Sequence, residues 1–414
     1  MNNRLPVYIG PDAVGHLVRY CRDHDLGHFA MIFDANTYRA VGEAAETALR
    51  AQGWDVLTVM LEGDDIIADA CYVFQAMLAL DHTPRTFVAV GSGTITDITR
   101  FVSHRSGREF ISLPTAASVD GFTSIGAPMV IEGVKTTVNC HGPLAVFADL
   151  PVLCAAPRKM VAAGFGDMLA KFTASADWEL GSLFGGEPFV ESIASRMRSA
   201  TWDCGRHADS IAAGSAEGVR ALMEGLIESG FCLLDYGSTL PASGWEHHIS
   251  HTLEMKLLRE GRHSILHGAK VGIGVLASAR RYGAVREMSR EEAAARLQAR
   301  ALPDVEAEIR GIRAAYGPVA SGIIAGQEPW FSMTADEFED LKARILEQWD
   351  EIRRIATVVP PADLMQGWIA GAGGPVRGPE AGLSEEEVAL ATTWARSLKH
   401  RMTIGRLSWM LGIG

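Results

Sequence analysis

The alternation of apolar runs with helical patterns over the first 150 residues most constrains how this chain can fold. Helical patterns cover 37–51, 66–80 and 94–105. Apolar, β-rich runs between them predict strands, and such alternation is typical of βαβ units that form a parallel sheet with helices on both faces. The predicted strands are 29–34, 54–60, 86–91, 109–114 and 144–149.

A hairpin is predicted within the same region, because a Glu132-Gly133 turn separates Pro128–Ile131 from Val134–Val138. From about residue 157 the pattern is helical. We therefore predict an α/β protein with an N-terminal parallel-sheet domain over 1–155 and an all-helical domain over 156–414.

Two segments of the helical region have the spacing of a capping box, in which a serine and a glutamate three residues later cap a helix start. They are Ser243–Glu246 and Ser384–Glu387. The first predicts a helix that carries His247 and His251, and the second predicts a helix from Val388 to about Lys399.

Length and composition fit a two-domain globular enzyme. A chain of 414 residues exceeds what one core usually supports. The net charge of −12 argues against nucleic acid or an anionic membrane as partner, since both require a basic face. Six scattered cysteines without a Cys-x-x-Cys pair predict reduced thiols in a cytoplasmic protein. The first residues, Met1–Val7, lack the apolar core of a signal peptide, and no apolar run approaches the ~20 residues of a membrane span, so we expect neither feature.

Two parts of the helical region together have the composition of a catalytic metal site. Asp167 follows two glycines, and His247 and His267 lie further along the chain, the latter in a His-Gly pair. One carboxylate and two imidazoles, with no fourth protein ligand, leave a position open for substrate. The pattern indicates a metal-assisted enzyme.

The neighbours of these residues leave alternatives open. His251 lies one helical turn from His247 on the same face, whereas His248 points roughly 100° away and is excluded as a ligand. Asp167 is expected early in a helix, where its alternative role is that of an N-terminal dipole partner. Lys171, one turn further, either lines the site or is a solvated surface lysine.

A second signal lies at the predicted strand end, where Gly91-Ser-Gly93 opens a helix. Such a turn lets the backbone approach a pyrophosphate, and the helix N-terminus favours an anion. It lacks the third glycine of the dinucleotide fingerprint, so a plain tight turn is an equal alternative. Asp34, at another strand end, either bonds an adenosine ribose or caps a helix, and spacing alone favours the cap.

These motifs resemble those of the bacterial sn-glycerol-1-phosphate dehydrogenase family, over about residues 30–275. The glycine turn, Gly164–Asp167 and the His-x-x-x-His series before His267-Gly268 are shared by a wider superfamily of glycerol dehydrogenases, iron-type alcohol dehydrogenases and 3-dehydroquinate synthases. The segment Thr115–Ser124 is narrower and points to the glycerol-phosphate branch.

The resemblance implies a Rossmann-like N-terminal domain, a dehydroquinate synthase-like overall fold and a bound NAD(H), with NADP(H) as the alternative. It places substrate contacts on Asp120, Asp167 and His251. It places the metal on Asp167, His247 and His267, with zinc or nickel as the ion, between which the sequence does not choose. The cofactor residues that it implies, together with Asp34 from the strand-end argument, are Asp34, Gly93, Thr94, Ile95, Thr96, Asp97, Thr115, Ala116, Ala117, Ser118 and Ser124.

The activity implied is the reversible NAD(P)H-dependent reduction of dihydroxyacetone phosphate to sn-glycerol 1-phosphate. The enzyme is expected to be a homo-oligomer, namely a homodimer. Lys135, Lys171 and His251 are candidates for binding the phosphate. The alternatives are a polyol dehydrogenase acting on glycerol, a dehydroquinate synthase-like lyase and a non-catalytic binding protein. Asp167 argues against the lyase, whose relatives prefer glutamate at that position.

Overall fold

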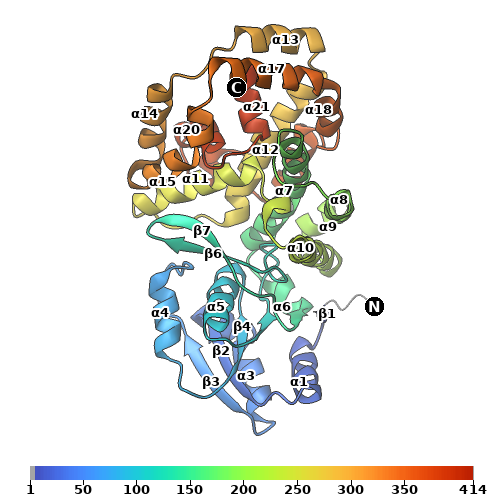
Figure 1. Cartoon of the computed structure of the whole chain (residues 1–414). Coiled ribbons are helices and arrows are strands. Elements are labelled where there is room, and N and C mark those ends of the chain that lie inside the picture. Colours follow the sequence, from blue (N-terminus) through green and yellow to red (C-terminus); the bar gives the residue numbers. More distant parts are fainter. Residues whose placement is uncertain (1–4, 414) are drawn as a thin grey trace. The chain divides into compact units, whose positions relative to one another are not determined.

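The computed structural model describes residues 5–413. It contains the predicted parallel sheet, with the strand order β1-β8-β5-β4-β2-β3 and parallel pairing between all neighbours (Figure 1). One short edge strand, β1, lies outside the predicted set. The strands are β1 (Val7–Gly10), β2 (His28–Phe33), β3 (Asp55–Met60), β4 (Thr86–Val90), β5 (Phe110–Leu113) and β8 (Val146–Asp149).

Alternate residues of the central strands face two separate helical layers. Phe29, Met31 and Phe33 of β2 pack in one apolar cluster, and Ala30 and Ile32 pack in another. Burial on both faces explains why these strands are continuously apolar rather than alternating. The first cluster includes residues of α1 (Ala13–Asp23) and α3 (Glu43–Arg50), and the second includes residues of α4 (Ala70–Leu78) and α5 (Gly93–Arg105).

The predicted hairpin is present as β6 (Gly126–Ile131) and β7 (Val134–Asn139), which pair in antiparallel register. Glu132 and Gly133 connect them with φ angles of 51° and 79°. Positive φ angles at both central residues are typical of a type I′ turn, whose twist matches that of the two strands. The prediction of this hairpin and its turn is confirmed.

After Asp149 the described residues, up to 413, form helices and no strand, as the sequence predicts. The longest helix, α7, has 26 residues. The α-helices are α6 (Leu150–Ala155), α7 (Arg158–Leu183), α8 (Glu191–Arg206), α9 (Ala208–Ala213), α10 (Ala216–Tyr236), α11 (Trp245–Arg259), α12 (His267–Glu287), α13 (Arg290–Ala299), α14 (Val305–Tyr316), α15 (Ala320–Gly326), α16 (Glu328–Phe331), α17 (Ala335–Glu347), α18 (Trp349–Ala356), α19 (Ala362–Gly371), α20 (Glu385–Trp394) and α21 (Ile404–Leu411).

The chain forms two compact units whose composition is not simply N-terminal and C-terminal. One unit comprises Met1–Met168, Ser199–Thr239 and Gly371–Gly373, and the other comprises the remaining residues. Helix α10 belongs with the sheet, since Arg220 donates a hydrogen bond to the Ile9 carbonyl at 2.7 Å. The domain boundary at residue 155 stays a prediction. The packing groups α9, α10 and parts of α7 and α8 with the sheet.

The two expected capping boxes have different outcomes. Ser384 and Glu387 form one at the start of α20, as predicted. At α11 the prediction is wrong, because the N-cap is Gly244 and no side chain from that residue caps the helix. Glu246 does bond the Gly244 N–H, but its carboxylate serves further partners in the interior.

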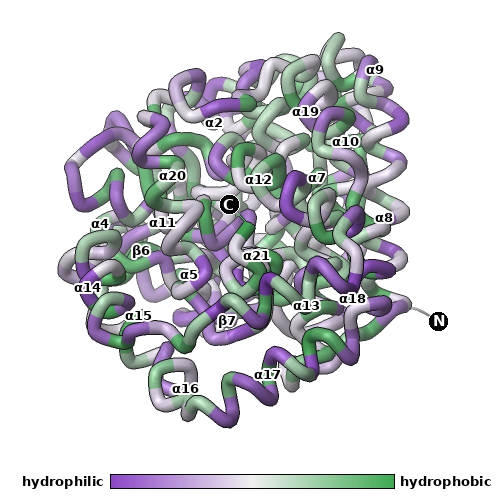
Figure 2. The backbone as a smooth tube through the Cα atoms, turned by 90° about the horizontal axis from the view of Figure 1, so that it is seen from above, coloured by the Kyte–Doolittle hydropathy of each residue, from purple (hydrophilic) through white to green (hydrophobic). Residues whose placement is uncertain are grey.

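Helix α18 of the second unit is amphipathic. In α18, Trp349, Ile352 and Ile355 are buried at helical spacing, and green and purple segments follow each other along this helix in Figure 2. None of the helices within residues 5–413 combines the length and apolar character that crossing a membrane requires.

Candidate metal centre and cofactor site

The glycine turn Gly91–Gly93 lies where the connections of the sheet diverge. From β2 the chain continues to β3 on one side, whereas from β4 it continues to β5 on the other. Open parallel sheets bind ligands at such a switch point, beyond the carboxyl ends of the strands. The turn follows β4, and Asp34 follows the neighbouring β2, so both lie at this position.

Close packing explains why glycines occupy the turn. A Cβ atom on Gly91 would lie 2.6 Å from the Ile95 Cβ, and one on Gly93 would lie 2.9 Å from a methyl group of Val119. Ser92, the N-cap of α5, makes no side-chain hydrogen bond to the helix. The N–H groups and dipole of α5 therefore face the end of the sheet without a side-chain cap, which suits a phosphate group.

The segment Thr115–Ser118 packs directly against this turn. The Thr115 N–H donates to the Gly91 carbonyl at 3.3 Å, and the hydroxyls of Ser92 and Ser118 share a hydrogen bond. All four residues of the segment are buried, whereas the side chain of Ile95 belongs to the apolar core. The structure thus brings the two predicted cofactor segments together, with Ile95 able to contact a ligand through its backbone alone.

Asp97 has a structural partner that the sequence analysis does not identify. Its carboxylate accepts a hydrogen bond from Arg100 at 3.1 Å, and burial raises the pKa of Asp97 to about 7 although Arg100 opposes the shift. Arg100 is fully buried and also donates to the carbonyls of Phe122 and Gly126. Asp97 and Arg100 therefore fix the loop that carries Ser124.

Asp34 is a helix cap, as its spacing favours. Its Oδ1 atom accepts hydrogen bonds from the N–H groups of Asn36 and Thr37 at 2.7 and 2.8 Å, in a capping box at α2 (Ala35–Thr37). Both capping bonds go to Oδ1, and Asp34 follows β2 at the switch point of the sheet.

Three predicted metal ligands converge. Asp167 of α7, His247 of α11 and His267, the first residue of α12, each offer a ligand atom, and these atoms lie within 4.8 Å of one another. Asp167 and His247 are buried, and His267 is partly exposed. The set fits a divalent ion with an open coordination position, because one carboxylate and two imidazoles are typical catalytic ligands.

The position of Asp167 in its helix differs from the expectation. Helix α7 begins at Arg158, so Asp167 lies in its interior rather than in its first turn. Gly164 does not open the helix. A glycine is required there because a Cβ atom would lie 1.9 Å from the Ala117 carbonyl oxygen. The glycine lets α7 pass against the Thr115–Ser118 segment.

Behind His247 lies a buried carboxylate. His247 Nδ1 and Glu246 Oε1 are 2.8 Å apart, and Glu246 is fully buried. Burial by itself would raise the pKa of Glu246, but hydrogen bonds from His247, Thr173 and Gly244 outweigh it and lower the pKa below its usual value. Glu246 is therefore the ionised partner of His247.

A second buried carboxylate holds the start of the same helix. Asp177 of α7 accepts hydrogen bonds from the N–H groups of Trp245 and Ile404 at 2.7 and 2.6 Å, and from the Tyr282 hydroxyl at 2.6 Å. Burial and the nearby charge of Glu246 raise its pKa. Asp177 thus joins α7, α11, α12 and α21 around the helices that carry the histidines.

The remaining candidates on these helices have distinct surroundings. The His251 ring centroid lies 6.3 Å from that of His247 and 6.1 Å from that of His267, yet His251 is outside the ligand cluster. His248 is buried, burial lowers its pKa well below the usual value, and it is also outside the cluster. The surface interpretation of Lys171 is wrong, since this side chain is 0% exposed.

Asp120 connects the predicted cofactor segment to Asp167, one of the predicted metal ligands. Its N–H donates to Asp167 Oδ2 at 3.2 Å, and its own carboxylate accepts a hydrogen bond from the Ser229 hydroxyl at 2.9 Å. Asp120 follows Ser118 by two residues in the same loop. The loop therefore orients the carboxylate of Asp167 through its backbone.

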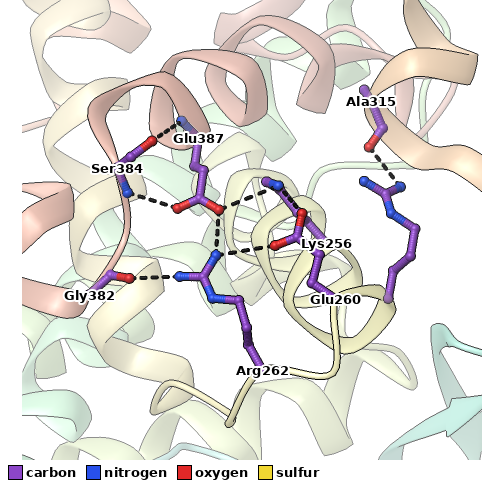
Figure 3. A network of polar contacts seen from close by, with 8 residues as sticks. Lys256, Glu260, Arg262, Ala315, Gly382, Ser384 and Glu387 are labelled. Atoms are coloured by element: carbon purple, nitrogen blue, oxygen red, sulfur yellow. Dashed lines mark hydrogen bonds and ion pairs between the residues drawn. The ribbon is translucent and has the colours of Figure 1, made fainter.

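The loop that precedes His267 is held by an ion-pair network (Figure 3). Arg262 donates to Glu387 at 2.5 Å and to the Gly382 carbonyl at 2.8 Å, and Lys256 lies 3.4 Å from the same Glu387 oxygen. Glu387 is also the capping glutamate of α20. Spacing within the sequence predicts the cap but not the arginine.

Comparison with known proteins identifies the family. A model of the iron-containing alcohol dehydrogenases matches residues 8–157. The glycerol-1-phosphate dehydrogenase (NAD(P)+) of Bacillus velezensis is 35% identical over 400 residues, which cover 96% of this chain and 89% of that protein. The chain belongs to the glycerol-1-phosphate dehydrogenase family. The enzyme of the same name from Halalkalibacterium halodurans is 44% identical over 271 residues, covering 65% of this chain and 68% of that protein.

Membership of this family makes the protein an NAD(P)-linked oxidoreductase of a metal-binding alcohol dehydrogenase group. A solved structure confirms the predicted architecture. The NADH-dependent butanol dehydrogenase A of Thermotoga maritima matches with a TM-score of 0.61 and 13% identity, covering 100% of this chain and 97% of that one. At this identity the likeness concerns the fold alone.

Proposed function

We propose that this protein reversibly reduces dihydroxyacetone phosphate to sn-glycerol 1-phosphate with NADH or NADPH. The observation that carries the proposal is the convergence of Asp167, His247 and His267 within 4.8 Å in a chain of the glycerol-1-phosphate dehydrogenase family. Its relatives are named glycerol-1-phosphate dehydrogenases. The three converging side chains could hold a metal ion, which would polarise the ketone carbonyl during reduction.

The proposed metal ligands are Asp167, His247 and His267. A divalent ion bound there would act as a Lewis acid on the ketone carbonyl of the substrate. The two imidazoles must be neutral to bind it, and the Glu246 contact at 2.8 Å fixes which nitrogen of His247 is available. Zinc and nickel both suit this ligand set.

The chain's other residues orient the cofactor and handle the proton. The α5 N-terminus beyond Gly91–Gly93 would bind the pyrophosphate, with Thr115–Ser118 beside it. A bound NAD(P)H would supply the hydride, and the chain's own residues would have to supply a proton to the substrate oxygen. We assign this proton to a relay through His251 or the carboxylate of Asp120, which Ser229 holds. Lys135, Lys171 and His251 are the proposed phosphate contacts.

The purified protein is expected to oxidise NADH in proportion to added dihydroxyacetone phosphate, and to turn over glycerol phosphate much faster than glycerol. The product should not react with an enzyme that oxidises only sn-glycerol 3-phosphate, because the fixed metal and cofactor positions expose one carbonyl face. Faster turnover of glycerol would favour a polyol dehydrogenase. Absence of net NADH consumption would favour a dehydroquinate synthase-like lyase.

NADH is expected to be preferred to NADPH, because the Asp34 carboxylate would bond a ribose 2′-hydroxyl and repel a 2′-phosphate. Asparagine can accept the same capping bonds, so Asp34→Asn should keep the stability and reduce the preference about tenfold, or ~1.4 kcal/mol. The measurement is kcat/KM with each cofactor.

Asp69→Asn is the matched control for this substitution. Asp69 caps α4 with the same geometry, accepting from the N–H groups of Cys71 and Tyr72. Its replacement should leave the cofactor ratio unchanged. A wild-type preference for NADPH, or an equal change in both variants, would contradict the assignment of Asp34.

A homodimer in the cytoplasm completes the proposal. The six scattered cysteines support a reducing compartment, and measurement of molecular mass in solution tests the dimer.

A further inference from the structure

The carboxylate of Glu246 receives hydrogen bonds from two elements. Its Oε1 atom lies 2.7 Å from the Gly244 nitrogen and 2.8 Å from His247 Nδ1, and its Oε2 atom lies 2.8 Å from the Thr173 hydroxyl on α7. The residue is 0% exposed. Glu246 is therefore held rigidly from two sides, next to a proposed metal ligand.

These contacts determine the tautomer of His247. A backbone N–H can only donate, so Glu246 Oε1 accepts from Gly244 and acts as the acceptor towards His247 as well. The hydrogen between Glu246 and His247 must therefore reside on Nδ1. The lone pair of the ring is then on Nε2, the nitrogen that remains to bind a metal ion.

We propose that Glu246 is a positioning residue that fixes the ring orientation and tautomer of His247 and thereby sets the metal affinity of the site. This inference rests on the proposed function, because it takes Asp167, His247 and His267 as the ligands. A carboxylate behind a ligating histidine raises the basicity of the ring, and its loss typically weakens metal binding by ~10–100-fold.

A purely structural role is the competing explanation. Glu246 accepts the N–H of the N-cap residue Gly244, so it also stabilises the start of α11. Asp177 does the same at the next residue, since its carboxylate accepts the Trp245 N–H at 2.7 Å. Both carboxylates are fully buried. Within residues 5–413, Asp177 accepts hydrogen bonds from Trp245, Tyr282 and Ile404 and from none of the three proposed ligands. Asp177 is thus a matched reference.

The experiment measures the affinity of the metal-free protein for Zn²⁺, and in parallel for Ni²⁺, by competition with a colour-changing chelator. The variants are Glu246→Ala, Glu246→Gln and Asp177→Asn. Glutamine keeps an acceptor for Nδ1 but removes the charge, so Glu246→Gln should bind about tenfold more weakly and Glu246→Ala about a hundredfold more weakly. Thermal unfolding with and without Zn²⁺ reports stability separately.

Asp177→Asn is expected to lower the unfolding temperature of the metal-free protein while changing the Zn²⁺ affinity less than about threefold. Equal weakening by Asp177→Asn and Glu246→Gln would overturn the inference, as would wild-type affinity in Glu246→Ala. If Glu246→Ala does not fold, Glu246→Gln decides alone. A wild-type protein that binds neither ion would refute the proposed metal centre itself, whereas tight wild-type binding without an effect at Glu246 refutes only the positioning role.

Discussion

Replacing His267 by alanine is expected to remove the metal and lower kcat by at least about a thousandfold. A metal ion contributes several kcal/mol to the stabilisation of developing negative charge, and each ~1.4 kcal/mol corresponds to a factor of ten in rate. Loss of one of three protein ligands leaves a two-ligand site. Metal content of the purified variant and its NADH oxidation rate are the measurements.

His248→Leu is the control for His267→Ala. His248 is a buried histidine on α11 outside the ligand cluster, and its Nδ1 atom has no hydrogen-bond partner within residues 5–413. Leucine of similar volume should be tolerated, with metal content unchanged. Full activity and stoichiometric metal in His267→Ala would show that His267 is not a ligand.

Gly164→Ala is expected to cost ~3 kcal/mol or more in the free energy of unfolding and to raise the KM for NADH. The new Cβ atom would lie 1.9 Å from the Ala117 carbonyl oxygen and 2.8 Å from its carbon. Both are backbone atoms, so either α7 or the Thr115–Ser118 segment must move, and overpacking of this kind is costly. Denaturant unfolding and cofactor titration measure the two effects.

Gly367→Ala provides a control with the opposite sign. Gly367 lies in the interior of α19, and a Cβ atom there would meet nothing within 4 Å. Alanine should therefore stabilise the protein by ~0.5–1 kcal/mol, because glycine loses more backbone entropy in a helix. A Gly164→Ala variant as stable as this control would mean that the contact with Ala117 is not a close one.

Local patterns predict most of the fold because the forces behind them are local. The sheet follows from apolar runs between helical stretches, and the hairpin follows from the Glu132-Gly133 turn. The edge strand β1 escapes prediction, because it has four residues and only one of them is buried. The grouping of α10 with the sheet also escapes it, since a hydrogen bond such as that from Arg220 to Ile9 joins residues 211 positions apart.

Residue type predicts the candidate metal ligands of the site but not the residues that orient them. Asp167, His247 and His267 are recognisable as candidate ligands by type and resemblance, and the structure brings them together. Glu246 is not recognisable, because its spacing from Ser243 predicts a capping box. Its partner Thr173 lies 73 positions away, and no periodicity within a helix indicates such a pairing.

The hydrogen bond from the Asp120 N–H to Asp167 has a thermodynamic consequence. The same loop carries the proposed cofactor residues Thr115–Ser118, so anything that orders the loop also orients the carboxylate, and the reverse holds equally. Two ligands that stabilise one shared arrangement bind with positive cooperativity, and the factor by which each improves the other is identical. The affinity for the dinucleotide would then be higher when the metal is bound, and the affinity for the metal would be higher when the dinucleotide is bound. Protein with only one of the two bound would be less populated than independent binding predicts.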